Sequence, residues 1–363
     1  MFVGWRDILF AKGRFTLIGA TVALITLLLV MLTGLTGGLG NQNTDALEKM
    51  GADRFVFAPS EIGGKASFTD SAVTAGQQDE WQAAGVNATP VGFLTGKVEG
   101  NGATSMSLIA TPAGSDLAEH TASLLQGTEP SDGQIALPTS VAEEIGATVG
   151  DTVTFSGTDV TVSGITEDTL YSHTNAGWAT TATWQGITHQ RETEGQDAVL
   201  GTVLAVTGSA DYAATSDATG TQALTTRESF AALPAYSSEN GSLKTMQGFL
   251  YDISALVIIS FLTVWTIQRT RDIAVMRALG ASRVFLTKDA LAQAAVILAV
   301  GSALGALVGW GLGTLAAGAV PFQLSALTIA GPAVGIWALG MGGALIALRR
   351  VATVDPMIAL GGN

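Results

Sequence analysis

The stretch RTRDIAVMRALGASR, residues 269–283, lies between two long apolar runs and combines positive charge with a helical pattern. Ile273, Met276 and Leu279 recur at a spacing of three, so one face of a helix here is apolar while the arginines lie mostly on the other faces. A short basic amphipathic helix between two membrane spans serves a surface, either lipid headgroups or another protein. A plain basic loop that follows the positive-inside rule is the alternative interpretation.

Composition places the chain in the membrane class. Of its 363 residues, 47% are hydrophobic and only 13% are charged, and the mean hydropathy is +0.40. The sequence contains no cysteine, which excludes disulfides, thiolate catalysis and cysteine metal sites.

Charge is distributed unevenly along the chain. Residues 41–252 contain 7 Lys/Arg and 26 Asp/Glu, a net charge of −19, whereas the remaining residues contain 10 Lys/Arg and 4 Asp/Glu, a net charge of +6. An acidic middle with basic flanks is typical of a membrane protein whose middle lies outside and whose flanks lie in the cytoplasm. The acidic balance also argues against nucleic acid as a partner.

The pattern predicts an α-helical membrane protein with four transmembrane helices plus an α+β extracytoplasmic domain between the first and the second. The run 15–38 has no charge and is long enough to cross a hydrocarbon core of about 30 Å. A signal peptide is the rival interpretation, but its apolar part is normally about 7–15 residues and no Ala-x-Ala site follows here. The predicted order is a cytoplasmic interfacial helix 1–14, TM1 15–38, the extracytoplasmic domain 39–245, TM2 246–268, a cytoplasmic helix and loop 269–288, TM3 289–318, an outer turn 319–323, TM4 324–348 and a cytoplasmic tail 349–363.

Local patterns predict elements within the extracytoplasmic domain. Residues 54–57 and 199–206 favour strands, and residues 79–84 and 115–125 favour helices. The clearest module covers residues 135–165. We expect a short helix capped by Thr139 or Ser140 and ending at Gly146, then a Gly150–Asp151 turn and a hairpin that alternates Val153/Phe155 with Val160/Val162.

Glycines follow a helical period in two of the predicted spans. Gly301, Gly305, Gly309 and Gly313 recur every four residues in TM3, which predicts a groove against which a neighbouring helix packs. The end of TM1 contains a second glycine-rich string over residues 33–43, which is either a close-packing surface or an ordinary glycine-rich helix end.

Motifs for catalysis are absent from the sequence. It contains no Gly-x-x-x-x-Gly-Lys-Ser/Thr phosphate loop and no Gly-x-Ser-x-Gly nucleophile motif, so the chain does not hydrolyse ATP by the P-loop route. His120, His173 and His189 have no metal-ligand spacing and are expected to be surface or loop residues.

Several of these strings resemble one protein family. The segment 269–283 resembles the cytoplasmic coupling segment of the FtsX/MacB superfamily of ABC-transporter permeases, R-x-R-E-I-A-x-L-R-A-L-G-A-S, with Asp272 in place of Glu. The module 135–165 resembles the helix, L-G-x-x-x-G-D-x-V and hairpin subdomain of MacB-type domains. The tail 349–360 resembles the ending R-R-A-A-R-x-D-P-x-E-A-L, from which it departs at Thr353 and Ile358. The exit of TM1, with Lys12-Gly-Arg14-Phe15 before the span, is similar to that of haem-efflux permeases within the superfamily.

The resemblance implies a type VII ABC exporter-like permease that is not itself an enzyme and acts as a homodimer with a separate ABC ATPase subunit. Its expected role is to expel haem or a similar amphipathic compound from the outer leaflet by mechanotransmission, without an intrinsic cofactor. Relatives that activate a cell-wall hydrolase, or that export antimicrobial peptides or lipoproteins, are the alternatives. The residues expected to couple to the ATPase are Arg271, Asp272, Met276, Arg277, Leu279, Gly280 and Ala281.

If haem is the cargo, its site needs an apolar slot, an iron ligand and a cation for the propionates. The outer ends of TM1 and TM2 offer these groups, although a methionine in a membrane helix is commonly a packing residue and a tyrosine there is commonly an interfacial anchor. The candidate haem-contacting residues are Met31, Tyr251, Met246, Arg54, Phe249 and Asp252.

Overall fold

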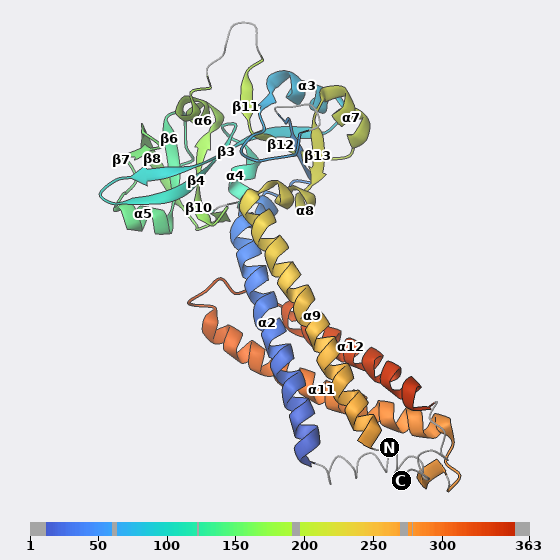
Figure 1. Cartoon of the computed structure of the whole chain (residues 1–363). Coiled ribbons are helices and arrows are strands. Elements are labelled where there is room, and N and C mark those ends of the chain that lie inside the picture. Colours follow the sequence, from blue (N-terminus) through green and yellow to red (C-terminus); the bar gives the residue numbers. More distant parts are fainter. Residues whose placement is uncertain are drawn as a thin grey trace. The chain divides into compact units, whose positions relative to one another are not determined.

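The computed structural model describes residues 12–59, 64–121, 123–190, 197–268, 275–277 and 279–352. The chain divides into two compact units (Figure 1). The membrane unit consists of Met1–Gly38 and Asn240–Asn363, and the outer domain consists of Leu39–Glu239. Most of the predicted interfacial helix 1–14 and most of the predicted tail 349–363 lie outside the described residues.

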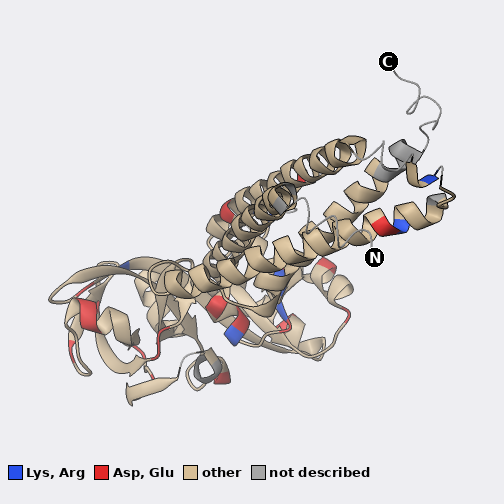
Figure 2. Cartoon of the chain, turned by 90° about the horizontal axis from the view of Figure 1, so that it is seen from below, with Lys and Arg blue, Asp and Glu red and all other residues tan. Residues whose placement is uncertain are grey.

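Among the described residues, four helices are long and apolar enough to cross a membrane. They are α2 (Lys12–Lys49), α9 (Pro234–Gln268), α11 (Arg283–Ala316) and α12 (Ala326–Ala352). The predicted fold class is therefore confirmed, with four spans and an α+β domain between the first and the second. In Figure 2, acidic residues are coloured on many elements of the outer domain, whereas long stretches of the four helices contain no charged residue.

The first two membrane helices are longer than hydropathy predicts. Helix α2 continues beyond the predicted end at residue 38 to Lys49, and α9 begins at Pro234 rather than at residue 246. The added turns of α2 contain polar residues, but their buried face, with Ala46 and Leu47 fully buried, packs into the core of the outer domain. Hydropathy detects only the lipid-embedded part of a helix, so it does not find turns that a protein core stabilises.

The predicted glycine groove on α11 is present, and its first three glycines receive α2, while Gly313 faces Phe322 and Leu324. The four glycines at 301, 305, 309 and 313 are buried. A Cβ added at Gly301 would lie 2.9 Å from the Gly19 carbonyl oxygen, and one added at Gly309 would lie 2.8 Å from Val30 Cγ1. The absence of side chains at these positions lets the two helices approach closely, which increases the dispersion contacts that stabilise helix pairs in lipid.

The glycine-rich string at the end of the first span holds the turn between α11 and α12. A Cβ at Gly34 or Gly38 would collide with Phe322 or with the Pro321 backbone. The Gln323 N–H also donates to the Gly34 carbonyl oxygen at 2.9 Å. This string is therefore a packing surface within the membrane unit and not a frayed helix end.

The outer domain is built on an 11-stranded sheet, in which the order β13-β1-β12-β3-β4-β10-β6-β8-β5 is joined by β7 and β9, while β11 and β2 form a separate pair. The strands are β1 (Arg54–Phe57), β2 (Val73–Thr74), β3 (Asn87–Glu99), β4 (Ala103–Thr111), β5 (Leu124–Gly127), β6 (Gln134–Pro138), β7 (Thr152–Phe155), β8 (Thr158–Thr166), β9 (Leu170–Tyr171), β10 (Thr174–Thr180), β11 (Val199–Gly201), β12 (Val203–Thr207) and β13 (Gln222–Thr225). The helices are α3 (Ala75–Ala83), α4 (Asp116–Thr121), α5 (Thr139–Ile145), α6 (Thr181–Thr188), α7 (Tyr212–Thr219), α8 (Thr226–Ser229) and the 3₁₀ turn η1 (Phe230–Ala232).

Side chains of the central strands β3 and β4 belong to two separate apolar cores. One core gathers phenylalanines around Phe68, whose ring meets those of Phe57 and Phe93 edge to face at centroid distances of 4.9 and 5.2 Å. The other core lies between α5, α6 and strands β6 to β8 and contains the fully buried Phe155. The adjacent residues Leu108 and Ile109 of β4 belong to different cores, so these two cores lie on opposite faces of the sheet.

Three predictions within this domain need correction. Residues 115–125 do not form one helix, because α4 ends at Thr121 and β5 then pairs with β8. The predicted strand 199–206 is two strands, β11 and β12. They separate at Thr202, whose N–H donates to the Val91 carbonyl oxygen and whose hydroxyl accepts from the Phe93 N–H. Side-chain hydrogen bonding to backbone interrupts regular elements in this way.

The third correction concerns the cap of α5. The N-cap residue is Pro138, with no side-chain cap, because Thr139 donates its hydroxyl to the Thr166 carbonyl oxygen instead. The other predicted features of the module are confirmed. Helix α5 ends at Gly146 in the left-handed region, with φ at +62°, and β7 and β8 form the predicted hairpin.

The Gly150–Asp151 turn is fixed by one carboxylate. Asp151 Oδ2 accepts from the Thr148 N–H at 2.7 Å and from the Thr148 hydroxyl at 2.9 Å. These two hydrogen bonds, first from the backbone and then from the hydroxyl, lower the pKa of Asp151 because they favour the ionised form.

The α2–α11 packing predicts opposite effects for two alanine substitutions in one helix. Gly305→Ala places a Cβ 2.8 Å from Thr26 Cβ and against the Ala23 carbonyl, whereas Gly311→Ala meets nothing within 4 Å. We expect Gly305→Ala to destabilise the protein by about 1–3 kcal/mol through overpacking and Gly311→Ala to be neutral or slightly stabilising. Thermal unfolding midpoints in detergent measure both, and equal midpoints would contradict the packing.

The Asp151 turn predicts a pH dependence with a defined sign. A carboxylate whose folded-state pKa is lowered stabilises the fold above its unfolded pKa of about 3.9, and that contribution is lost as the pH falls through the folded value. Asp151→Asn keeps the shape and removes the charge. From pH 7 to pH 3, an interval that includes the unfolded pKa, the thermal unfolding midpoint of the wild type should therefore fall further than that of the variant. Parallel pH profiles would refute this assignment.

Candidate functional site

The described part of the predicted coupling segment forms the end of a helix and the start of the next. The Ala281 N–H donates to the Met276 carbonyl oxygen and the Gly280 N–H donates to that of Arg277, both at 3.0 Å. Gly280 has φ at +97°, so the pair forms a Schellman cap that needs glycine. Ser282 then caps α11 by accepting from the Phe285 N–H at 3.2 Å. Arg271 and Asp272 lie outside the described residues.

An exposed apolar patch surrounds this turn. Leu279 is 83% exposed, and Val275, Val284 and Phe285 are about half exposed or more. Met276 and Arg277 are half-buried. Large apolar side chains gathered at a turn, beside a cation, are typical of a surface that a partner or a lipid interface covers. We name Val275, Leu279, Val284 and Phe285 the turn patch.

Three of the candidate haem-contacting residues lie on one open face of α9. Met246 and Phe249 are 54% and 63% exposed, and Asp252 is also exposed. The same face continues with Ile253 and Leu256. A carboxylate within an apolar helix face is costly in lipid, so this face combines the apolar and polar groups that an amphipathic ligand or a second chain requires.

The remaining candidates in the membrane helices are placed differently. Tyr251 packs against α12, where its hydroxyl oxygen would lie 3.2 Å from a Cβ at Gly335, and it belongs to the apolar core of the membrane unit. Met31 is half-buried on α2. Tyr251 is thus directed toward a neighbouring helix and not onto the open face of α9.

Arg54 belongs to the outer domain and has structural contacts there. Its guanidinium carbon lies 4.3 Å from the ring centroid of Tyr212, and Nη1 donates to the Ala223 carbonyl oxygen at 3.4 Å. A cation–π contact and a hydrogen bond together account for its position. The role of all six candidates in haem binding stays a prediction.

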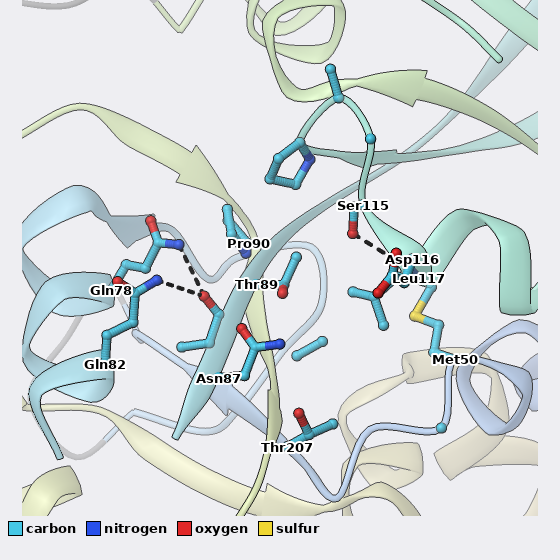
Figure 3. A pocket seen from close by; sticks show the side chains of 16 residues that line it. Met50, Gln78, Gln82, Asn87, Thr89, Pro90, Ser115, Asp116, Leu117 and Thr207 are labelled. Carbon is cyan, nitrogen blue, oxygen red and sulfur yellow. Dashed lines mark hydrogen bonds between the residues drawn. The ribbon is translucent and has the colours of Figure 1, made fainter. Parts of the chain in front are cut away.

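A cleft of about 510 Å³ in the outer domain was not predicted (Figure 3). It lies beside residues 87–90 of β3. Strand β4 does not pair with these residues, because the pairing of the two strands begins at Gly92 and Ala110. Gln78 and Gln82 of α3 both donate to the Ala88 carbonyl oxygen, at 2.9 and 3.4 Å. Pro90 has no N–H to offer. The strand edge in this cleft is therefore blunted against pairing with another strand.

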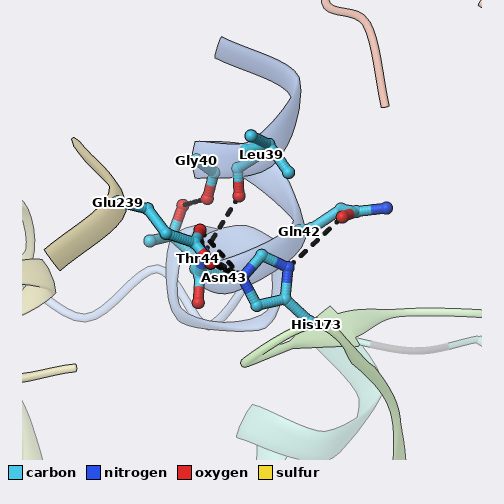
Figure 4. Close-up of polar contacts among 7 residues, drawn as sticks. All are labelled: Leu39, Gly40, Gln42, Asn43, Thr44, His173 and Glu239. Carbon is cyan, nitrogen blue, oxygen red and sulfur yellow. Dashed lines mark hydrogen bonds and ion pairs between the residues drawn. The ribbon is translucent and has the colours of Figure 1, made fainter. Parts of the chain in front are cut away.

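The histidines differ in their surroundings. His173 lies in the turn between β9 and β10, as expected of a loop residue, and its side chain contacts Gln42, Asn43 and Glu239 (Figure 4). His189 ends α6 in the left-handed region, and the side chain of His120 lies outside what the structure describes. Within the described ranges, no group of three or more His, Asp or Glu side chains is arranged to hold a metal ion.

Four apolar helices, an α+β domain inserted after the first of them and a capped basic turn before the third define an ABC-transporter permease. The family model described as MacB-like periplasmic core domain matches residues 16–222, and that described as FtsX-like permease C-terminal matches residues 248–356. Because the first match covers more than half of the chain, the protein belongs to the MacB-like family, with an FtsX-like C-terminal part. The resemblance predicted from the sequence is confirmed.

Full-length relatives share this organisation. The chain is 24% identical over 368 residues to the "Putative hemin transport system permease protein HrtB" of Staphylococcus epidermidis, covering 100% of both chains. It is 26% identical over 369 residues to the protein of the same name from Staphylococcus haemolyticus, covering 100% of this chain and 99% of the relative. Among solved structures, it is similar to the extracellular domain of the noncanonic ABC-type transporter YknZ from Gram-positive bacteria. That similarity covers 48% of this chain and 99% of the other, with 13% identity and a TM-score of 0.33.

Proposed function

We propose that this permease is the membrane subunit of an ATP-driven exporter that expels haem or a similar amphipathic compound from the outer leaflet. The observation that carries the proposal is the end-to-end similarity to relatives that are named hemin transport permeases. Both halves of the chain match permease families, so the similarity extends over the membrane helices as well as the outer domain.

Energy enters from a separate ATPase subunit in this proposal, because the sequence contains no P-loop. The turn patch and Arg277 are the proposed docking surface. A patch of apolar side chains beside a cation suits a groove on a soluble partner, and the Schellman cap fixes the direction in which the chain enters α11. The basic flanks support a cytoplasmic position for this turn and both termini, which is part of the proposal.

The open face of α9 is the proposed cargo surface. Its apolar side chains suit the flat porphyrin ring, the Met246 thioether and the Asp252 carboxylate are potential iron ligands, and Met31 of α2 supplies a second thioether in the membrane unit. Arg54 would contact a haem propionate only after its cation–π contact with Tyr212 is broken. Because the face is exposed in a single chain, a homodimer that covers it is part of the proposal.

Mechanotransmission gives the proposed mechanism. Helices α2 and α9 each continue without a break from a membrane span into the outer domain. Movement of the cytoplasmic turn would therefore reach the outer domain through rigid helices, as a shift between two conformations driven by ATP binding. Cargo would enter sideways from the outer leaflet and be expelled when the outer domains close.

Growth on graded haem tests the cargo. We expect a deletion strain to lose haem tolerance and the wild-type chain to restore it. A Met246→Leu/Asp252→Asn double variant should restore tolerance poorly, because it removes both potential iron ligands while preserving side-chain size. Ser260→Ala, a small change at another exposed position of α9, is the matched control. Unchanged tolerance on deletion would refute haem as cargo and favour a non-transporting role, such as activation of a cell-wall hydrolase, or export of another amphipathic compound.

ATPase stimulation tests the docking surface. Arg277→Glu should abolish stimulation of the ATPase subunit without unfolding the outer domain, because it reverses the charge beside the turn patch. Gly280→Ala should weaken stimulation, since a residue with a Cβ at φ +97° strains the turn by about 1 kcal/mol or more. Lys288→Glu makes the same charge change at an exposed position within α11 and serves as the control. Full stimulation by the Arg277 variant would rule this surface out.

A further inference from the structure

A turn of the outer domain is attached to helix α2 through two left-handed residues. Ser172 and His173 have φ values of +49° and +65° and lie between β9 and β10. Their N–H groups donate to the carbonyl oxygens of Asn43 and Gln42 at 3.2 and 3.1 Å. Positive φ is uncommon for residues other than glycine, although histidine is among those that tolerate it, and here the contacts with α2 hold the backbone in place.

The imidazole of His173 lies between α2 and α9 (Figure 4). Nε2 is 3.0 and 2.9 Å from the two carboxylate oxygens of Glu239, which belongs to α9. Nδ1 is 3.3 Å from Gln42 Oε1 on α2. The Asn43 amide nitrogen of α2 lies 3.0 Å from Nε2 and 3.4 Å from Glu239 Oε2. One side chain from the turn thus contacts both helices.

The chemistry of these partners determines the protonation state that fits. A carboxylate oxygen and an amide oxygen are acceptors, so the nitrogen that faces each of them must carry a hydrogen. Both ring nitrogens of His173 face such oxygens. With both ring nitrogens protonated, each of these oxygens receives a hydrogen, and the two Asn43 amide hydrogens go to the Leu39 carbonyl and to Glu239 instead of to Nε2, which lies 3.0 Å away.

Removing one proton breaks part of this arrangement. If Nε2 loses its hydrogen, a lone pair faces the Glu239 carboxylate at 2.9 Å; if Nδ1 loses it, the bond to Gln42 is lost. Asn43 is fully buried, and its Oδ1 atom has no hydrogen-bond partner. The Asn43 amide nitrogen already donates to the Leu39 carbonyl oxygen at 3.0 Å, so donating to a deprotonated Nε2 would cost it one of its present contacts.

The other ionisable groups near this turn are engaged elsewhere. On α2, Asp45 accepts from the Leu170 N–H and pairs with Lys49 at 2.8 Å. On β9, burial raises the pKa of Tyr171, so its phenol stays neutral. Among the described residues, Glu239 is the carboxylate that directly contacts the His173 ring.

We propose that His173 is a positioning residue that, as an imidazolium, ties α2 to α9 where both helices enter the outer domain. We call the set of Gln42, Asn43, His173 and Glu239 the stalk latch. Because the Glu239 contact needs a hydrogen on Nε2 and the Gln42 contact needs one on Nδ1, the latch is closed in mild acid and loosens as the pH rises. If the proposed transport function holds, on which this last step rests, the latch sets how far the two helices move as one body.

The absence of cysteine in the chain allows a direct distance measurement. Glu48→Cys on α2 and Ser237→Cys on α9 introduce a pair of spin labels at exposed positions of the outer domain. Electron–electron dipolar spectroscopy on the full chain in lipid nanodiscs then gives the distance distribution between the labels at about pH 5.5 and about pH 8.5, on either side of the imidazole titration. We expect a narrow peak at the lower pH and loss of that peak at the higher pH.

Variants separate the latch from a general effect of pH. His173→Asn keeps a residue that tolerates the left-handed region but removes the ring, and should give the broad distribution at both values. Glu239→Gln should remove the pH dependence. His189→Asn, the same change at another left-handed histidine, should behave as the wild type. A narrow peak in the His173 variant at both pH values, or no pH dependence in the wild type, would overturn the latch.

This readout distinguishes the latch from the proposed function. The labels report a distance within one domain, so a failed latch leaves haem export untouched. Conversely, a functioning latch in a chain whose deletion leaves haem tolerance unchanged would refute only the cargo.

Discussion

Close approach of backbones in the membrane unit is the constraint on which the rest of the structure depends. Glycines at four-residue intervals on α11 receive α2, and glycines on α2 receive the turn before α12. In lipid no hydrophobic effect draws helices together, so dispersion contacts at short range must replace it. Helix α2 is thereby fixed along its membrane length, and it is the same helix that enters the core of the outer domain through Ala46 and Leu47.

Helices α2 and α9 each run without a break from a membrane span into the outer domain. The buried face of the extended turns of α2 and the contacts of His173 with both helices attach the outer domain to them. The blunted strand edge beside Gln78 and Gln82 protects that domain from pairing with other strands where its sheet opens.

The predictions from sequence are confirmed where a feature depends on residues adjacent in the chain and fail where it depends on distant residues. The four spans, the left-handed end of α5 at Gly146 and the cap at Gly280 were predictable because each depends on residues adjacent in the chain. The α5 cap and the strand 199–206 were predicted wrongly because Thr139 and Thr202 bond to distant strands instead of to their own neighbourhood. The latch was missed for the same reason, since Asn43, His173 and Glu239 come from three separate parts of the chain.

The sequence by itself determined that this is a four-span permease with an acidic outer domain, basic flanking segments and no P-loop, because hydropathy, charge and short motifs are local properties. Tertiary structure alone decided which glycines face a neighbour, that Tyr251 turns toward α12 while Met246 and Phe249 stay open, and that Arg54 is held by Tyr212. Side-chain direction and exposure depend on what packs against each residue, and the partner is in every case far away in the sequence.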